Sequence, residues 1–165
     1  MFGNKKTNEV IDISVGISSL TPVYPGDPEP NIRKIFCLPD DGASVSSISM
    51  GSHTGTHIDA PSHIFEDGKS VDKLQLDTLV GNAVLLDLSS IKQTIKKQDL
   101  ENALNEFDMT DNIDILLIKT QNSKIWTDSS SMGFESMISL DRSSGEWIVE
   151  NGFKSVGIDG FSVDV

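Results

Sequence analysis

The sequence predicts a mixed α/β fold in a single domain spanning residues 1–165, with a core sheet or barrel and helices packed on it. Two observations lead to this prediction. A chain of 165 residues with 37% hydrophobic and 23% charged residues has the size and composition of one globular domain. Strand-like segments fill its first half, whereas strand-like and helix-like segments alternate in its second half.

The first half has patterns typical of antiparallel strands. Three segments carry alternating or β-branched residues, and turn-forming clusters such as YPGDPEP lie between them. These segments are residues 9–16, 31–38 and 43–50. We expect them to pair as antiparallel neighbours.

The second half contains three short, almost continuously apolar segments, which are residues 82–89, 113–120 and 154–160. This pattern is typical of strands covered on both faces. Two helices are expected between them. Residues 96–107 place an apolar stripe on one helical face, formed by Leu100, Ala103, Leu104 and Phe107. Residues 139–152 begin at a plausible cap, Ser139, and end at Gly152.

The charge balance argues against several classes of partner. With 13 basic and 25 acidic residues the formal net charge is -12, which disfavours nucleic acid and anionic membrane surfaces. No apolar run approaches the roughly 20 residues needed to span a bilayer, and the first ten residues do not resemble a signal peptide. A cytoplasmic location is therefore expected. The single Cys37 is expected to be a small buried hydrophobe rather than a nucleophile.

All three histidines lie in the segment GSHTGTHIDAPSHIFEDG, residues 51–68. His53, His57 and His63 share their parity with Asp59, so an extended backbone would point all four side chains to one face. A straight strand would nevertheless hold His53 and His63 about 33 Å apart. The segment is therefore expected to bend at Gly55 and Pro61, and these residues also make a continuous helix unfavourable.

Two interpretations of this segment are open. Any one of the histidines alone is explained by a hydrogen bond in a polar turn. The whole set, with an acid and flexible glycine beside it, favours a metal site. Imidazole together with carboxylate suits Zn²⁺, Mn²⁺ or Fe²⁺ better than Mg²⁺ or Ca²⁺, which prefer oxygen ligands.

The string HTGTHIDAPSH resembles the signature of the cyclase family of metal-dependent hydrolases, which includes bacterial kynurenine formamidase and isatin hydrolase. Further segments resemble successive parts of that family along nearly the whole chain, among them IDIS, TPVYPGDPEP, ILLIKT and EWIVENGFKSVGIDGFSVD. The resemblance implies a swivelling β/β/α-type fold with a central barrel-like β core and packed helices.

The resemblance also implies roles for five residues. His53 and His57 would bind a first divalent metal, Zn or Mn, and Asp59 would bridge it to a second. His63 would be the proton donor or acceptor. Tyr24 matches a position where formamidases place an aromatic ring against the substrate, and a packed loop aromatic is the alternative. A small-molecule amide substrate and a homo-oligomer are expected.

The implied activity is metal-dependent hydrolysis of an amide, formamide or lactam bond, with N-formylkynurenine giving kynurenine and formate as the leading case. The family supplies a further His and a Glu after the GIDGFSVD segment, whereas this sequence ends at Val165. We therefore expect a C-terminally truncated member. A catalytically impaired module that only binds metal or forms dimers is the alternative.

Overall fold

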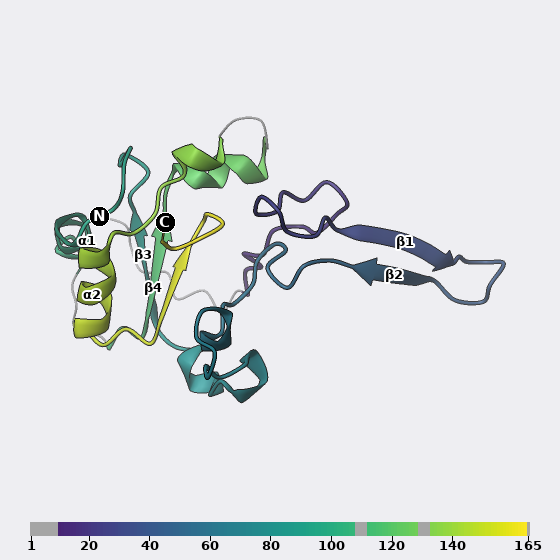
Figure 1. Ribbon diagram of the computed structural model, residues 1–165, viewed down its shortest axis with the longest axis horizontal. Helices are drawn as coiled ribbons and strands as arrows, with labels where there is room; N and C mark the ends of the chain where they lie inside the picture. The colour runs from purple at the N-terminus through teal and green to yellow at the C-terminus, as the bar shows by residue number, and fades with distance from the viewer. Residues whose placement is uncertain (1–9, 108–111, 129–132, 165) are drawn as a thin grey trace.

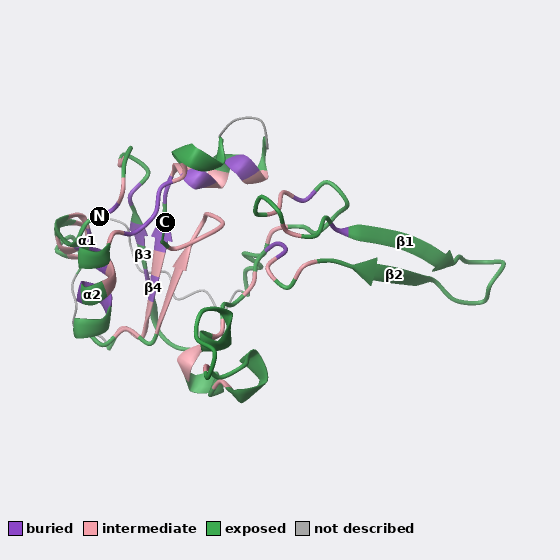
Figure 2. Ribbon diagram, in the orientation of Figure 1, coloured by how far each residue is buried: buried purple, intermediate pink, exposed green. Residues whose placement is uncertain are grey.

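The computed structural model describes residues 10–107, 112–128 and 133–164, and a long hairpin extends away from the rest of the fold (Figure 1). Its strands are β1 (Asn31–Phe36) and β2 (Val45–Ser49). They pair in antiparallel fashion, as predicted, with a bulge between Lys34 and Phe36. Every residue of both strands is exposed, as the continuous green ribbon in Figure 2 shows.

Three short strands form a parallel sheet in the order β3-β4-β5. They are β3 (Ala83–Asp87), β4 (Ile115–Lys119) and β5 (Ser155–Ile158). All three lie within the segments that the apolar pattern predicted. The register pairs Val84 with Leu116 and Leu86 with Ile118, and these four side chains are almost completely buried.

Two helices cover one face of this sheet. They are α1 (Lys97–Leu104) and α2 (Arg142–Glu150), and they supply Leu100, Trp147 and Ile148 to the core. The other face of β3 is open, because its burial alternates along the strand and Leu85 is 54% exposed. The prediction that these strands are covered on both faces is therefore wrong for β3. The reason is that α1 and α2 pack only on the face of β3 that carries Val84 and Leu86.

The start of α2 differs from the prediction. Asp141, not Ser139, caps the helix, and its Oδ1 accepts a hydrogen bond of 2.9 Å from the Ser144 amide. Ser139 lies three residues before the first helical residue, Arg142, and its carbonyl accepts a hydrogen bond from the Ile95 amide over 2.8 Å. Gly152, at φ +75°, follows the end of α2 as expected. Helix α1 ends before Phe107, whose side chain is 45% exposed.

Two further predictions are wrong. Residues 10–16 contain no strand, because no neighbouring strand pairs with them, and residue 9 lies outside the described residues. Cys37 is exposed rather than buried. It follows β1 in the turn of the hairpin, where nothing packs over it and its amide donates to the Asp41 carboxylate over 2.7 Å.

Ion pairs join the ends of the parallel strands. Lys119 Nζ lies 2.8 Å from Asp87 Oδ2, and Lys154 Nζ lies 2.9 Å from Asp114 Oδ1. Hydrogen bonds from these ammonium groups lower the pKa of both carboxyl groups. A lowered pKa means that folding favours the ionised acid, so this contribution to stability is present near neutral pH and is lost on acidification.

The described residues thus form a mixed α/β fold with two separate sheets, and no closed barrel is seen among them. The barrel-like core stays a prediction. Within these residues, no helix has the length and apolar character required to cross a lipid bilayer.

Candidate metal centre

The three predicted ligands, His53, His57 and Asp59, come together in the loop that follows β2. His53 Nδ1 lies 2.7 Å from Asp59 Oδ1, and His57 Nε2 lies 3.4 Å from the same oxygen. The three side chains each offer one ligand atom, and these atoms all lie within 4.8 Å of one another. Among the described residues this is the one group of His, Cys, Asp and Glu side chains arranged to hold a metal ion.

Gly55 makes the bend that brings these side chains together. Its φ of +72° is in the left-handed region, which favours glycine. Added volume is also unfavourable here, because a Cβ at this position would lie 3.2 Å from Ile17 Cγ1. The neighbouring Thr56 Oγ1 accepts a hydrogen bond of 3.0 Å from the Val15 amide. The segment around residues 15–17 therefore packs against the bend and holds it.

The orientation of His57 suits a metal ligand. Its Nδ1 lies 2.8 Å from the Gly55 carbonyl oxygen, which can only accept, so the neutral ring carries its proton on Nδ1. The lone pair is then on Nε2, the atom that faces Asp59. Metal-binding histidines commonly donate their other N–H to a backbone carbonyl in this way.

Two of the three distances between donor atoms are close to those found around a small transition-metal ion. Ligands about 2.05 Å from a tetrahedral ion lie about 3.3 Å from one another. The His57–Asp59 distance of 3.4 Å already matches, whereas the 2.7 Å contact of His53 with Asp59 would open by about half an ångström. The side chains of His53 and Asp59 are 27% and 46% exposed, so the cluster is open to solvent.

His63 lies beside the cluster rather than in it. Pro61 begins a short 3-10 helix, Pro61–His63, which makes the second expected bend. The ring of His63 then packs on that of His53, with 4.2 Å between their centroids. His63 is exposed and is not one of the three clustered ligands.

Sequence reasoning missed Gly68, which supports this 3-10 helix. A Cβ at Gly68 would overlap the Pro61 carbonyl group and lie 2.6 Å from the Ser62 nitrogen. The Ser62 amide also donates to the Lys69 carbonyl over 3.1 Å. Only glycine allows this close approach of two backbones. The signal available in the sequence was the turn-forming EDG that follows the last histidine.

Tyr24, the fifth residue with a predicted role, contacts another aromatic residue. Its ring packs edge-on against Phe134, with 4.6 Å between the centroids, and Phe134 in turn stacks on Phe161. Trp126 completes this aromatic group next to Phe161. Tyr24 remains 42% exposed, so the packing role and a contact with substrate are compatible. Its substrate role stays a prediction.

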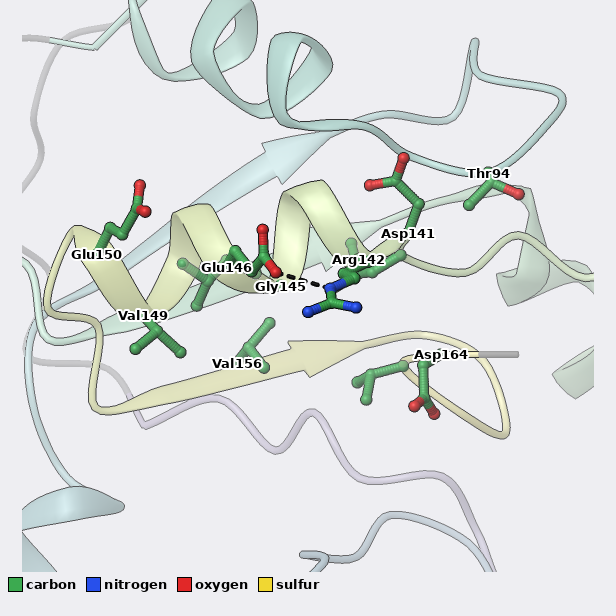
Figure 3. Close-up of a pocket in the computed structure, with 12 residues that line it drawn as sticks. Thr94, Asp141, Arg142, Gly145, Glu146, Val149, Glu150, Val156 and Asp164 are labelled. Carbon is green, nitrogen blue, oxygen red and sulfur yellow. Dashed lines mark hydrogen bonds and ion pairs between the residues drawn. The ribbon is translucent and has the colours of Figure 1, made fainter.

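A cavity of about 1000 Å³ lies between α2 and β5, where Val149 and Val156 face each other (Figure 3). Its lining residues come from positions 94–164 and include none of the predicted site residues. Arg142 and Glu146 form an ion pair along its edge. The cavity is therefore separate from the histidine cluster.

The sequence of this chain is similar to the sequences of known enzymes. The chain is 32% identical over 161 residues to kynurenine formamidase of Bacillus mycoides (strain KBAB4), which covers 96% of this chain and 72% of that relative. A second kynurenine formamidase, from Salinibacter ruber, is 36% identical over 93 residues, covering 55% of this chain and 44% of the relative.

Solved structures agree with this relationship. A structure described as a predicted metal-dependent hydrolase from Bacillus stearothermophilus matches with a TM-score of 0.70 and 29% identity, covering 95% of this chain and 71% of the other. Isatin hydrolase A from Ralstonia solanacearum shares the fold, with a TM-score of 0.76 at 20% identity over 93% of this chain and 68% of the other. The family model described as "Putative cyclase" matches residues 11–165. The chain therefore belongs to the cyclase family.

Proposed function

We propose that this cyclase-family chain is a metal-dependent hydrolase of a formamide, amide or lactam bond, with N-formylkynurenine as the leading substrate. The observation that carries the proposal is the convergence of His53, His57 and Asp59 on one open position. The names of the relatives support the reaction class, because the curated relatives are kynurenine formamidases and a solved relative is described as a metal-dependent hydrolase.

The donor set indicates the chemistry of the site. Zn or Mn bound there would lower the pKa of a bound water and polarise the carbonyl of the scissile bond. His53, His57 and Asp59 would hold the ion, and the His57–Gly55 hydrogen bond would fix the ring that presents Nε2. The exposure of Asp59 leaves space on one side of the cluster for the substrate carbonyl.

His63 is the acid–base group in this proposal. Imidazole exchanges a proton near neutral pH, and general acid–base catalysis typically contributes 10²–10⁴-fold to a rate. The ring lies against His53 but outside the ligand cluster, so it could protonate the leaving nitrogen without occupying a ligand position. Tyr24, on its exposed face, is proposed as part of the wall that contacts an aryl group.

The proposal is tested by incubating the purified chain with N-formylkynurenine, a simple aryl formamide and isatin. Formation of kynurenine or of the free aryl amine supports a formamidase, and ring opening of isatin alone would point to lactam hydrolysis. No hydrolysis of any of the three by metal-bound protein would contradict the proposal. That result would favour the alternative of an impaired module.

We expect His63→Ala to lower kcat by about 10²–10⁴-fold while leaving metal content unchanged, because His63 supplies a proton rather than a ligand. The measurement combines steady-state kinetics with metal analysis of the same sample. Loss of metal in His63→Ala as complete as in His57→Ala would mean that the roles assigned to these two residues are wrong.

A further inference from the structure

Four aromatic side chains that lie outside the hydrophobic core form a continuous row. The distances between successive ring centroids are 4.6, 6.4 and 5.6 Å, and the members of this aromatic row are, in spatial order, Tyr24, Phe134, Phe161 and Trp126. The aromatic residues in or against the core are two others, Trp147 and Phe153. The row is therefore a feature separate from the packing that holds the sheet and helices together.

Each ring of the aromatic row is partly open to solvent. Tyr24 and Phe134 are 42% and 38% exposed, and Phe161 and Trp126 are half-buried. Large apolar side chains that gather on a surface commonly mark a binding site, and sites for small molecules are lined mainly by apolar and aromatic groups. The row is thus suited to contact a ligand.

The row lies where a parallel sheet usually binds its ligand. Trp126 ends the 3-10 helix Gln121–Trp126, which follows β4, and Phe161 lies shortly after β5. In open sheets of parallel strands, ligands bind beyond the carboxyl ends of the strands. Both rings are therefore placed by the loops from which such sites are built.

Tyr24 joins the row to the loop of the candidate metal centre. It belongs to the segment that runs from Val15 to Pro28. At one end of this segment, the Val15 amide donates a hydrogen bond of 3.0 Å to Thr56 Oγ1. At the other end, Pro28 Cδ lies 3.5 Å from the point that a Cβ on Gly51 would occupy. The segment that carries Tyr24 is therefore anchored on the loop that carries the predicted ligands.

Asp159 fixes the other end of the row. Its carboxylate accepts hydrogen bonds from the amide and the hydroxyl of Thr120, over 2.8 and 2.7 Å, and from the amide and the hydroxyl of Ser123. Its backbone carbonyl accepts a bond of 2.9 Å from Trp126 Nε1. Asp159 therefore joins the loop after β4, which carries Trp126, to the loop after β5, which carries Phe161.

Asn122 ties the segment of Phe134 to the same loops. Its Nδ2 donates to the Ile138 carbonyl over 2.7 Å, and its Oδ1 accepts from the Ile138 amide over 2.8 Å. Phe134 begins the 3-10 helix Phe134–Ser136, just before Ile138. A Cβ at Gly160 would lie 2.5 Å from Asn122 Nδ2, so this buried amide lies directly against the loop of Asp159. The rings are therefore held in a fixed arrangement.

We propose that Phe134 and Phe161 extend the wall formed by Tyr24, and that the aromatic row binds the aryl ring of the substrate. The row then makes the enzyme selective for formamides of aromatic amines over formamides of alkyl amines, because only a flat ring can adopt the stacked or edge-on geometry of aromatic pairs. Asp159 is a positioning residue, since it acts through the loops that carry the rings. This inference rests on the proposed hydrolase function.

The first test measures binding without turnover, so it is independent of hydrolysis. Formanilide and N-cyclohexylformamide, which have the same number of carbon atoms, are titrated into the metal-free chain labelled with ¹⁵N at tryptophan. The sequence has two tryptophans, so Trp147 in the core is the internal control for Trp126, and a Trp126→Phe variant assigns the two indole signals. We expect formanilide to shift the Trp126 signal and to bind at least about threefold more tightly than N-cyclohexylformamide. An unmoved Trp126 signal, or equal affinity for the two compounds, would overturn the proposal.

The second test removes single rings. Phe134→Leu and Phe161→Leu should each weaken formanilide binding by about 3–10-fold, the usual strength of one aromatic contact, and should leave N-cyclohexylformamide binding unchanged. Phe107→Leu is the matched control, because Phe107 is also an exposed phenylalanine, at 45%, but follows α1 outside the row. Unchanged formanilide binding in both row variants, or an equal loss in Phe107→Leu, would contradict the assignment.

The third test concerns Asp159. Asp159→Asn should weaken binding of formanilide by at least about threefold but not that of N-cyclohexylformamide, because it loosens the rings without removing them. A merely structural role would weaken both equally, and that result would overturn the positioning role. Ser123→Ala, which removes one bond to the same carboxylate, should show a smaller effect of the same kind and serves if Asp159→Asn does not fold. Intact, selective formanilide binding without hydrolysis by the metal-bound chain would contradict the proposed function alone.

Discussion

His57→Ala and Asp59→Ala are expected to raise the dissociation constant for Zn²⁺ or Mn²⁺ by at least about 100-fold. The reason is that each removes one of three clustered donors, and loss of even an outer-shell partner commonly costs 10–100-fold. Titration of the metal-free chain should give one ion per chain, because the described residues contain one such cluster. Isothermal calorimetry with metal analysis measures both quantities.

Asp72→Ala is the control for Asp59→Ala. Asp72 is also an exposed acid, but it pairs with Lys73 outside the cluster, so its loss should leave the affinity unchanged. Unchanged metal affinity in both His57→Ala and Asp59→Ala would refute the assignment of the site. Binding of two ions per chain with similar affinity would show that other residues complete a second position.

Gly68→Ala is expected to reduce turnover by about 100-fold or more and to destabilise the protein by roughly 1–3 kcal/mol, the usual cost of overpacking. The added methyl group would overlap the backbone of Pro61 and Ser62, so the 3-10 helix that carries His63 would have to move. A small misplacement of a catalytic group costs about 10²-fold in rate. Denaturant unfolding and steady-state kinetics measure the two effects.

Gly145→Ala is the matched control for this change. A Cβ at Gly145 meets nothing within 4 Å, and the residue lies inside α2, so alanine there should be neutral or slightly stabilising. Wild-type turnover and stability in Gly68→Ala would contradict the role of Gly68 as a positioning residue.

The sequence predicted the gathering of His53, His57 and Asp59 better than it predicted the surrounding packing, and their role as metal ligands stays a prediction. Shared parity of the histidines with Asp59 led to the expectation that these side chains converge if the segment bends at Gly55 and Pro61, and the chain does bend at both residues. Gly68 could not be inferred in the same way. Its importance depends on a contact with Pro61 that exists only once the chain has folded back.

The fold was predictable where local patterns decide it. The apolar runs at β3, β4 and β5 and the alternation in β1 and β2 specify strands, and these predictions are confirmed. Cys37 was misjudged because its apolar neighbours in sequence suggest burial, whereas the hairpin holds them away from the core. Whether a strand-like segment is buried depends on what packs over it, and local sequence does not contain that information.

Metal dependence of hydrolysis tests the central claim most directly. The unaltered chain would be assayed on N-formylkynurenine as purified, after complete removal of metal by a chelator, and after addition of Zn²⁺ or Mn²⁺. We predict that turnover falls in proportion to the metal removed and returns when one ion per chain is restored. Turnover that persists unchanged in the metal-free protein would contradict the account.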